Sequence, residues 1–271
     1  MPGYIEFSDE NGTYRISREN PPIILDDVIE DMVIPVLLAA GYSRQSINDY
    51  YIPDPTTDLV HLHDPSEPEL IAALYVETNG CYFNLPGVDP WDIKRDARLY
   101  AGPHRIVAHP PCQRWGRFSE GHMTIKGKTT GDDGGCFAAA LLALHKFGGV
   151  LEHPAHSKAW DAFYIPKPEK TDWLYCGKNA WTCEVEQGHY GHVARKKTWL
   201  LVVGPKPPEL IWGPSEQRLP AKRLAERGYE SARRCGAVAN QSSRQRQRTP
   251  LEFRDLLISI AQNTQAQALS A

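Results

Sequence analysis

Short apolar runs alternate with glycine- and proline-containing loops through the middle of the chain. The runs at 70–77, 105–112 and 148–154 predict strands, and the apolar segment at 135–147 predicts a helix between the last two. A later run at 197–204 predicts one more buried strand. Strands that alternate with helices in this way are typical of a parallel α/β sheet, so we predict an α/β fold.

The predicted strands end in residues that carry chemistry. Glu77, Cys112 and Glu152 stand at the ends of the first three runs. Ligands of open α/β sheets bind beyond the carboxyl ends of the strands. We therefore expect these three side chains to lie near a functional site.

Changes in composition divide the chain into four parts. We predict an acidic N-terminal extension over 1–68, a catalytic α/β core over 69–204, a basic C-terminal region with a closing helix over 205–262, and a disordered tail over 263–271. The boundary near residue 68 follows a segment rich in Pro, Asp and Thr, which is typical of a linker.

The N-terminal extension is predicted to be small and mainly helical. Residues 4–17 alternate around an Asn-Gly pair, which indicates a hairpin. Residues 24–50 predict two short helices, because Pro35 interrupts the first helix and Gly41 ends it.

A closing helix is predicted over 249–262. Thr249 is a suitable N-cap, Pro250 suits the first helical position, and Glu252 completes a capping box. The apolar face of this helix consists of Phe253, Leu256, Leu257 and Ile260.

Bulk composition restricts the class of protein. The chain of 271 residues is 41% hydrophobic and has no apolar run of about 18 residues, so we expect no membrane span. Its start lacks the pattern of a signal peptide. Six widely spaced cysteines are best explained as reduced thiols, and together these features predict a cytoplasmic protein.

The net charge of −3 conceals an uneven distribution. Residues 1–70 carry 14 acidic and 3 basic side chains, whereas residues 205–254 carry 11 basic and 5 acidic ones. The basic region could bind the phosphates of a nucleic acid. It could equally be an ordinary solvated surface, and the sequence leaves both interpretations open.

Three motifs in the core carry a family resemblance. The chain contains Pro-Pro-Cys-Gln at 110–113 with Phe-Ser at 118–119, then Leu-Glu-His-Pro at 151–154, then Tyr-Gly at 190–191. In this order and with these intervening elements, they resemble the motifs of the cytosine C5 DNA methyltransferase family. The resemblance covers about residues 74–204 and implies a reduced Rossmann-like methyltransferase sheet.

The resemblance implies a nucleophile and a carboxylate acting on one base. Cys112 would add to C6 of cytosine from a turn that Pro111 makes rigid, and Glu152 would contact N3 and the N4 amino group. Such a nucleophile needs a low thiol pKa, which Arg114, Arg117 or His109 could provide. Further substrate contacts are assigned to Gln113, Arg114, Arg117 and His153 near the base, and to Arg195, Lys196 and Lys197 at O2 or a phosphate.

S-adenosylmethionine is the cofactor that the resemblance implies. Glu77, Asn79 and Gly80 would form its turn, and Asp89 or Asp92 would bind its ribose. Only 32 residues separate Gly80 from Cys112, little more than one βαβ unit. The cofactor-binding half therefore looks truncated, and a hydroxymethylating or hypermodifying enzyme with another one-carbon donor is the main alternative.

The chain also departs from the family in its substrate-reading parts. His153 stands where the family has Asn, and Ala194 where it has Gln. About 45 residues separate Gly204 from Thr249, too few for an ordinary target-recognition domain. We expect DNA or a nucleotide as substrate, with no membrane association and no obligate protein partner.

Three other functions remain open at this stage. The chain could be a non-catalytic, DNA-binding relic of a methyltransferase. A hydrolytic Cys-His pair could form from Cys112 with one of its nearby histidines, His104, His109 or His122. A zinc site could form from Cys176, Cys183, His189 and His192, although their spacing is unusual and our favoured interpretation contains no metal.

Overall fold

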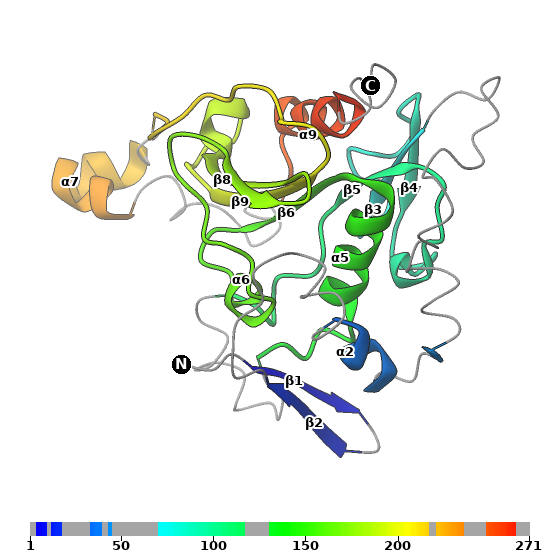
Figure 1. Cartoon of the computed structure of the whole chain (residues 1–271). Coiled ribbons are helices and arrows are strands. Elements are labelled where there is room, and N and C mark those ends of the chain that lie inside the picture. Colours follow the sequence, from blue (N-terminus) through cyan, green and yellow to red (C-terminus); the bar gives the residue numbers. More distant parts are fainter. Residues whose placement is uncertain are drawn as a thin grey trace.

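A mixed sheet of seven strands forms the body of the protein (Figure 1). The computed structural model describes residues 4–9, 12–17, 33–39, 43–44, 70–116, 130–216, 221–235 and 248–263. The strand order is β4-β3-β5-β6-β9-β8-β7. The strands span, in chain order, β3 (Ile71–Leu74), β4 (Val88–Trp91), β5 (Arg105–Ala108), β6 (Gly149–Pro154), β7 (Leu174–Gly177), β8 (Ala180–Glu186) and β9 (Lys197–Val203).

The α/β class is confirmed, but the sheet is only partly parallel. Strands β4, β3, β5 and β6 run parallel to one another, whereas β9 pairs antiparallel with β6, and β8 and β7 continue this antiparallel half. The expectation of a parallel sheet was therefore wrong for 197–204. The connection from β8 to β9 spans the ten residues 187–196, and it contains the 3₁₀ helix η4 (Gln187–Tyr190) but no crossover α-helix. Such a connection joins antiparallel neighbours.

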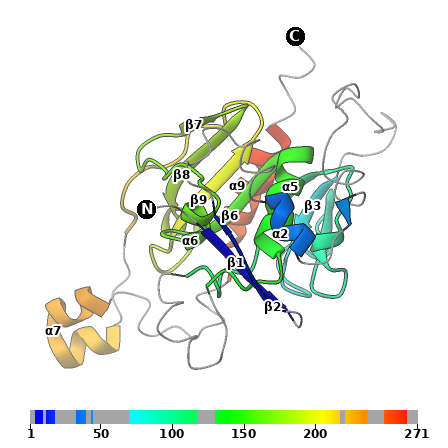
Figure 2. The same ribbon diagram turned by 60° about the horizontal axis from the view of Figure 1, so that its bottom comes forward.

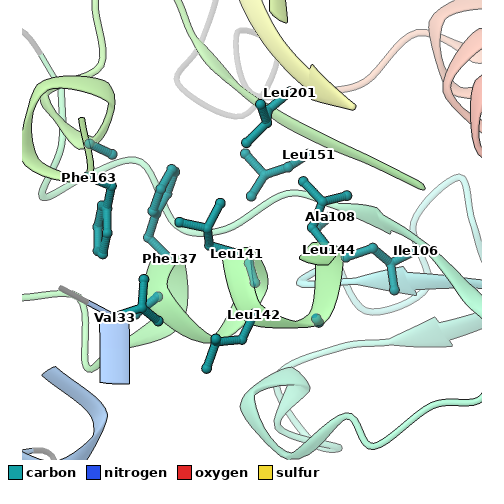
Figure 3. Close-up of a cluster of buried hydrophobic side chains, with 14 of the residues drawn as sticks. Val33, Ile106, Ala108, Phe137, Leu141, Leu142, Leu144, Leu151, Phe163 and Leu201 are labelled. Carbon is teal, nitrogen blue, oxygen red and sulfur yellow. The ribbon is translucent and has the colours of Figure 1, made fainter. Parts of the chain in front are cut away.

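Helices cover both faces of the sheet. The helix α5 (Cys136–Phe147) packs on β5 and β6 from one side, and α9 (Leu251–Asn263) packs on the same strands from the other. Alternate strand residues accordingly join two cores, with Ile106 on the α5 side and Val107 on the α9 side. Figure 3 shows Leu141 and Leu144 of α5 near strand residues of the first core.

The central helix is buried almost all round. Every residue from Phe137 to Leu144 is buried, because α2 (Ile34–Ala39) covers the side of α5 that faces away from the sheet. Val33 and Leu37 contribute to this contact and are fully buried. The short helix α6 (Lys158–Ala162) adds Trp160 to the same core.

The described part of the N-terminal extension is not mainly helical. It consists of an antiparallel hairpin, β1 (Tyr4–Asp9) with β2 (Gly12–Ser17), and the single short helix α2 (Figure 2). The predicted hairpin is confirmed. Pro35 lies in the first turn of α2, where the missing N–H costs nothing. Apart from 33–39 and 43–44, the predicted 24–50 region, Gly41 included, falls outside the described residues.

The C-terminal region contains two helices of different character. The predicted closing helix is α9, which buries Phe253, Leu257 and Ile260 as expected. The helix α7 (Ala221–Cys235) is interrupted by non-helical geometry at Gly228 and stands to the side of the sheet in both views. In the part of the chain that the structure describes, no helix is long and apolar enough to cross a membrane.

Candidate functional site

The strand order places a topological switch point at the carboxyl ends of β3 and β5, the position at which open α/β sheets have their ligand-binding crevice. The chain leaves β3 toward β4 on one side and later returns to β5 on the other. A reversal of this kind is where open α/β sheets bind their ligands. The loops after the two strands meet here, because the backbone N–H of His109 donates to the carbonyl of Leu74 at 3.0 Å.

Four side chains, from the loop after β3, the end of β5, strand β6 and the end of β8, form a hydrogen-bonded group at this edge. His109 Nδ1 lies 2.9 Å from Glu152 Oε2, and His109 Nε2 lies 2.8 Å from the hydroxyl of Tyr82. On the other side, Gln187 Nε2 donates to Glu152 Oε1 at 3.2 Å. We call Tyr82, His109, Glu152 and Gln187 the Glu152 network.

Glu152 is an ionised carboxylate at neutral pH although its side chain is only 12% exposed. Burial disfavours its charge, but the hydrogen bond and charge of His109, with help from Lys196 and His153, lower its pKa to about 2. The carboxylate therefore meets a ligand as a hydrogen-bond acceptor.

The same environment favours the charged form of Glu152 but disfavours the charged form of Cys112. Burial and the negative charge of Glu152 raise the pKa of its thiol, while a backbone hydrogen bond and the charge of Lys196 act against them. The expected low thiol pKa was therefore wrong. His109 cannot favour the thiolate as we expected, because both of its ring nitrogens already contact Tyr82 and Glu152.

The turn that carries Cys112 is anchored by Trp115. The backbone N–H of Trp115 donates to the carbonyl of Cys112 at 3.0 Å, and its own carbonyl accepts from Lys158 N at 2.9 Å. Its buried indole Nε1 donates to Asp133 Oδ2 at 2.7 Å. Asp133 also accepts from the backbone N–H of Phe137 at 2.9 Å, so the turn is fastened to the start of α5.

Replacing Asp133 by alanine is expected to destabilise the protein by about 3 kcal/mol, because buried N–H groups lose their acceptor and a helix loses its cap. Burial raises the pKa of Asp133 to about 6, although its hydrogen bonds oppose this shift. Urea unfolding followed by tryptophan fluorescence measures the effect. Asp132→Ala is the matched control, since Asp132 makes none of these bonds, and equal losses in both variants would contradict the anchor.

The other residues predicted near the base do not all reach the network. Gln113 is exposed and Arg114 is half-buried, both on the Cys112 turn, while Arg117 falls outside the described residues. Pro111 is exposed in the same turn, as a rigid flanking residue can be. His153 lies in the core on the α5 side, where Nδ1 is 2.6 Å from Ser157 Oγ, because consecutive strand residues face opposite sides.

One of the three predicted basic residues lies close to the network. Lys196 is half-buried; burial lowers its pKa, and the charges of Glu152 and Cys112 raise it. Arg195 and Lys197 instead face buried carboxylates. Lys197 Nζ lies 3.1 Å from Glu184, and Arg195 Nε lies 3.7 Å from Glu186.

The residues predicted to hold S-adenosylmethionine form a closed arrangement. Asn79 and Gly80 make a tight turn, in which Gly80 N donates to the Glu77 carbonyl at 2.8 Å. Asp92 is 5% exposed and accepts from Thr78 Oγ1 at 2.6 Å.

Asp89 lies within the edge strand β4. It pairs with Arg95 at 2.5 Å and accepts from the indole of Trp91 at 2.7 Å. Both candidate ribose carboxylates thus already have donors inside the protein. In this arrangement, Asp89 and Asp92 do not fit an adenosine ribose.

The alternative metal and hydrolytic sites receive no support from the geometry. Among the described residues, no three His, Cys, Asp or Glu side chains gather as a metal site. Cys183 lies in the α9-side core, whereas His189 Nε2 contacts the Gly213 carbonyl. For hydrolysis, His109 is engaged away from Cys112, and His122 falls outside the described residues.

A cavity of about 350 Å³ lies between the end of the 3₁₀ helix η4 (Gln187–Tyr190) and the start of α9. Arg248 lines this cavity, and its carbonyl accepts a hydrogen bond from Lys196 Nζ at 3.2 Å. The cavity therefore lies beside Lys196, the lysine whose charge acts on Glu152. The lining residues are Gly191, His192, Val193, Arg248, Thr249, Pro250, Leu251 and Glu252.

Sequence reasoning missed Tyr82, Gln187 and the Trp115–Asp133 pair. Gln187 had a usable signal, since it directly follows an alternating strand pattern and so stands at a strand end. Tyr82 lies in the middle of a long loop and had none. No protein-family model matches the chain, and neither does any curated protein or solved structure.

Proposed function

We propose that the protein modifies cytosine at C5, with Cys112 as the nucleophile that adds to C6 and Glu152 as the group that contacts N3 and N4. The observation that carries the proposal is the placement of the two residues. Cys112 follows β5 and Glu152 lies in β6, which are adjacent parallel strands, and the charge of Glu152 acts on the Cys112 thiol. The four parallel strands would form a reduced Rossmann-like half-sheet of the methyltransferase kind.

The chemistry suits the charge state of the site. As Sγ bonds to C6, the thiol loses its proton and N3 gains one, so the adduct remains neutral while C5 becomes nucleophilic. C5 then bonds to the carbon of a one-carbon donor while the bond from that carbon to the rest of the donor breaks and its electron pair leaves with the donor. C5 loses its own proton, the C6–S bond breaks, and the proton on N3 returns to the sulfur. At the start, ionised Glu152 accepts a hydrogen bond from the N4 amino group. As N3 becomes basic, Glu152 takes up the proton that the thiol loses and passes it to N3.

Substrate binding is assigned mainly to Lys196. It is the predicted basic residue that lies near both Cys112 and Glu152, so it would hold O2 of the base or a neighbouring phosphate. Arg195 and Lys197 would contribute less, because buried carboxylates offset their charge. The basic C-terminal region would add sequence-independent attraction to DNA. A base within a duplex would have to be flipped out to reach the crevice.

The donor is the open part of the proposal. Methylation is the reaction that the motifs favour, but the two predicted ribose carboxylates, Asp92 and Asp89, already accept from Thr78 and Arg95. This observation favours the alternative, a hydroxymethylating or hypermodifying enzyme that uses a one-carbon donor other than S-adenosylmethionine.

A trapping experiment tests the proposal. DNA containing 5-fluorocytosine, and the corresponding free nucleotide, are incubated with the protein alone, with S-adenosylmethionine or with methylenetetrahydrofolate. Fluorine cannot leave C5 as a proton does, so the covalent adduct accumulates and mass spectrometry locates it. We expect an adduct at Cys112, and the donor that promotes it identifies the reaction. No adduct under any of these conditions would contradict the proposal.

The second candidate is a non-catalytic DNA-binding relic of a methyltransferase. The raised pKa of the Cys112 thiol and the closed arrangement around Asp92 favour it. It predicts salt-sensitive DNA binding with no adduct and no modified base, and binding that is unchanged in Cys112→Ser and Glu152→Gln.

A further inference from the structure

His109 is the residue that joins the two loops of the crevice to the carboxylate. Its ring bridges Tyr82 at 2.8 Å and Glu152 at 2.9 Å, so both nitrogens are engaged. The ring is stacked obliquely against Tyr82, with centroids 5.4 Å apart. Its backbone N–H is also tied to β3, which leaves the imidazole little freedom to turn.

The hydrogen bonds assign the tautomer of the ring. Ionised Glu152 can only accept, so Nδ1 carries the hydrogen of the 2.9 Å link to the carboxylate. In the neutral imidazole Nε2 is then an acceptor, and the hydroxyl of Tyr82 donates to it; when the ring is protonated and carries the charge that favours ionised Glu152, Nε2 donates to the hydroxyl instead. Tyr82 keeps that hydrogen, because burial, with Cys81 and Glu152 nearby, raises its pKa well above the ordinary value.

We propose that His109 is a positioning residue that orients Glu152 and keeps it ionised until a pyrimidine enters the crevice, with Tyr82 holding the required tautomer. This inference rests on the proposed function for its role in the reaction. The effect of His109 on the charge of Glu152 does not depend on the proposed function.

The other groups around Glu152 cannot replace His109. Gln187 is uncharged and donates one hydrogen bond to Glu152 Oε1. Its Nε2 also donates to Thr198 Oγ1 at 3.0 Å. Lys196 and His153 favour the carboxylate less than His109 does, and burial and Glu152 together leave His153 with a pKa of about 4. Cys112 and Tyr82 bear no positive charge. A buried carboxylate that loses its main donor becomes harder to ionise.

Two substitutions at His109 separate position from charge. His109→Phe fills the same space and removes both hydrogen bonds. His109→Asn places an amide N–H near the position of Nδ1, and so restores the bond to Glu152 without the link to Tyr82. Tyr82→Phe removes only the hydroxyl, which makes it the mildest change and the variant of choice if His109→Phe does not fold.

The main readout is the titration of Glu152 itself, followed by NMR of protein labelled at the glutamate carboxyl carbons. Glu152→Gln identifies the signal. We expect the midpoint to rise by about two pH units in His109→Phe, to return most of the way in His109→Asn, and to rise by less than one unit in Tyr82→Phe. A midpoint in His109→Phe within half a unit of the original, or no recovery in His109→Asn, would overturn the inference.

The trapping experiment supplies a second readout. The pH dependence of adduct formation with 5-fluorocytosine should shift by the same amount as the Glu152 midpoint in each variant. A shifted Glu152 titration with no adduct in any protein would refute the proposed function and leave His109 as the group that sets the charge of Glu152. An adduct with an unshifted pH profile in His109→Phe would refute the positioning role alone.

Discussion

Replacing Gly149 by alanine is expected to destabilise the protein by about 4 kcal/mol or more, at the upper end for single substitutions. Gly149 begins β6 with a φ of +119°, which side chains rarely adopt. An added Cβ would lie 2.1 Å from the carbonyl oxygen of Ile106 and 2.8 Å from its nitrogen. Both are backbone atoms of β5 in the centre of the sheet, so no side-chain rotation relieves the clash.

The matched control for this substitution is Gly87→Ala. Gly87 also has a positive φ, +77°, but nothing lies within 4 Å of its missing Cβ. It should lose only about 1 kcal/mol, the cost of the strained backbone alone. Urea unfolding of the two variants measures the difference. Similar losses of unfolding free energy in the two variants would show that backbone strain, rather than the clash with β5, determines the effect.

The same substitution bears on the candidate site. Glu152 lies three residues after Gly149 on one strand, and the pairing of Ile106 with Gly149 sets the register between β5 and β6. A displaced β6 would move Glu152 away from His109, which follows β5. Any Gly149→Ala protein that still folds should therefore show a raised Glu152 titration midpoint, even though residue 149 makes none of the hydrogen bonds to the carboxylate.

The sequence predicted the strands that are buried on both faces. β3, β5, β6 and β9 are short continuous apolar runs because helices cover both sides of this part of the sheet. β4 was missed because Asp89 and Pro90 look like a turn, and proline is tolerated there since β4 is an edge strand. β8 alternates apolar with polar residues and directly follows the turn residues Gly177 to Asn179, so its signal was present in the sequence but was overlooked.

The candidate site was predictable where it depends on strand ends and unpredictable where it depends on loop packing. Cys112 and Glu152 follow directly from where two parallel strands stop. Tyr82 reaches His109 only because a long loop folds back over the sheet, and no local pattern encodes that contact. Lys196 and Lys197 look equivalent in sequence, yet Lys197 lies within β9 and faces Glu184, while Lys196 precedes the strand and lies near Glu152.

Replacing Cys112 by serine is expected to abolish the adduct with 5-fluorocytosine completely while the protein remains folded. A serine hydroxyl nearly matches the thiol in size, but it is a far weaker nucleophile toward C6 and lacks the accessible anion that a thiol can form. Cys112 is only half-buried, and its turn is anchored through Trp115 rather than through the sulfur. The unfolding midpoint should therefore change little.

Cys176→Ser is the control that isolates the role of Cys112. Cys176 is also half-buried but lies on β7, the edge strand at the antiparallel end of the sheet, away from β5 and β6. Its thiol pKa is likewise raised by burial, to about 11, so the two cysteines differ in position more than in ordinary reactivity. Adduct formation should be unchanged in Cys176→Ser. An adduct that persists in Cys112→Ser, or disappears in Cys176→Ser, would show that another residue attacks the base and would remove the foundation of the proposed chemistry.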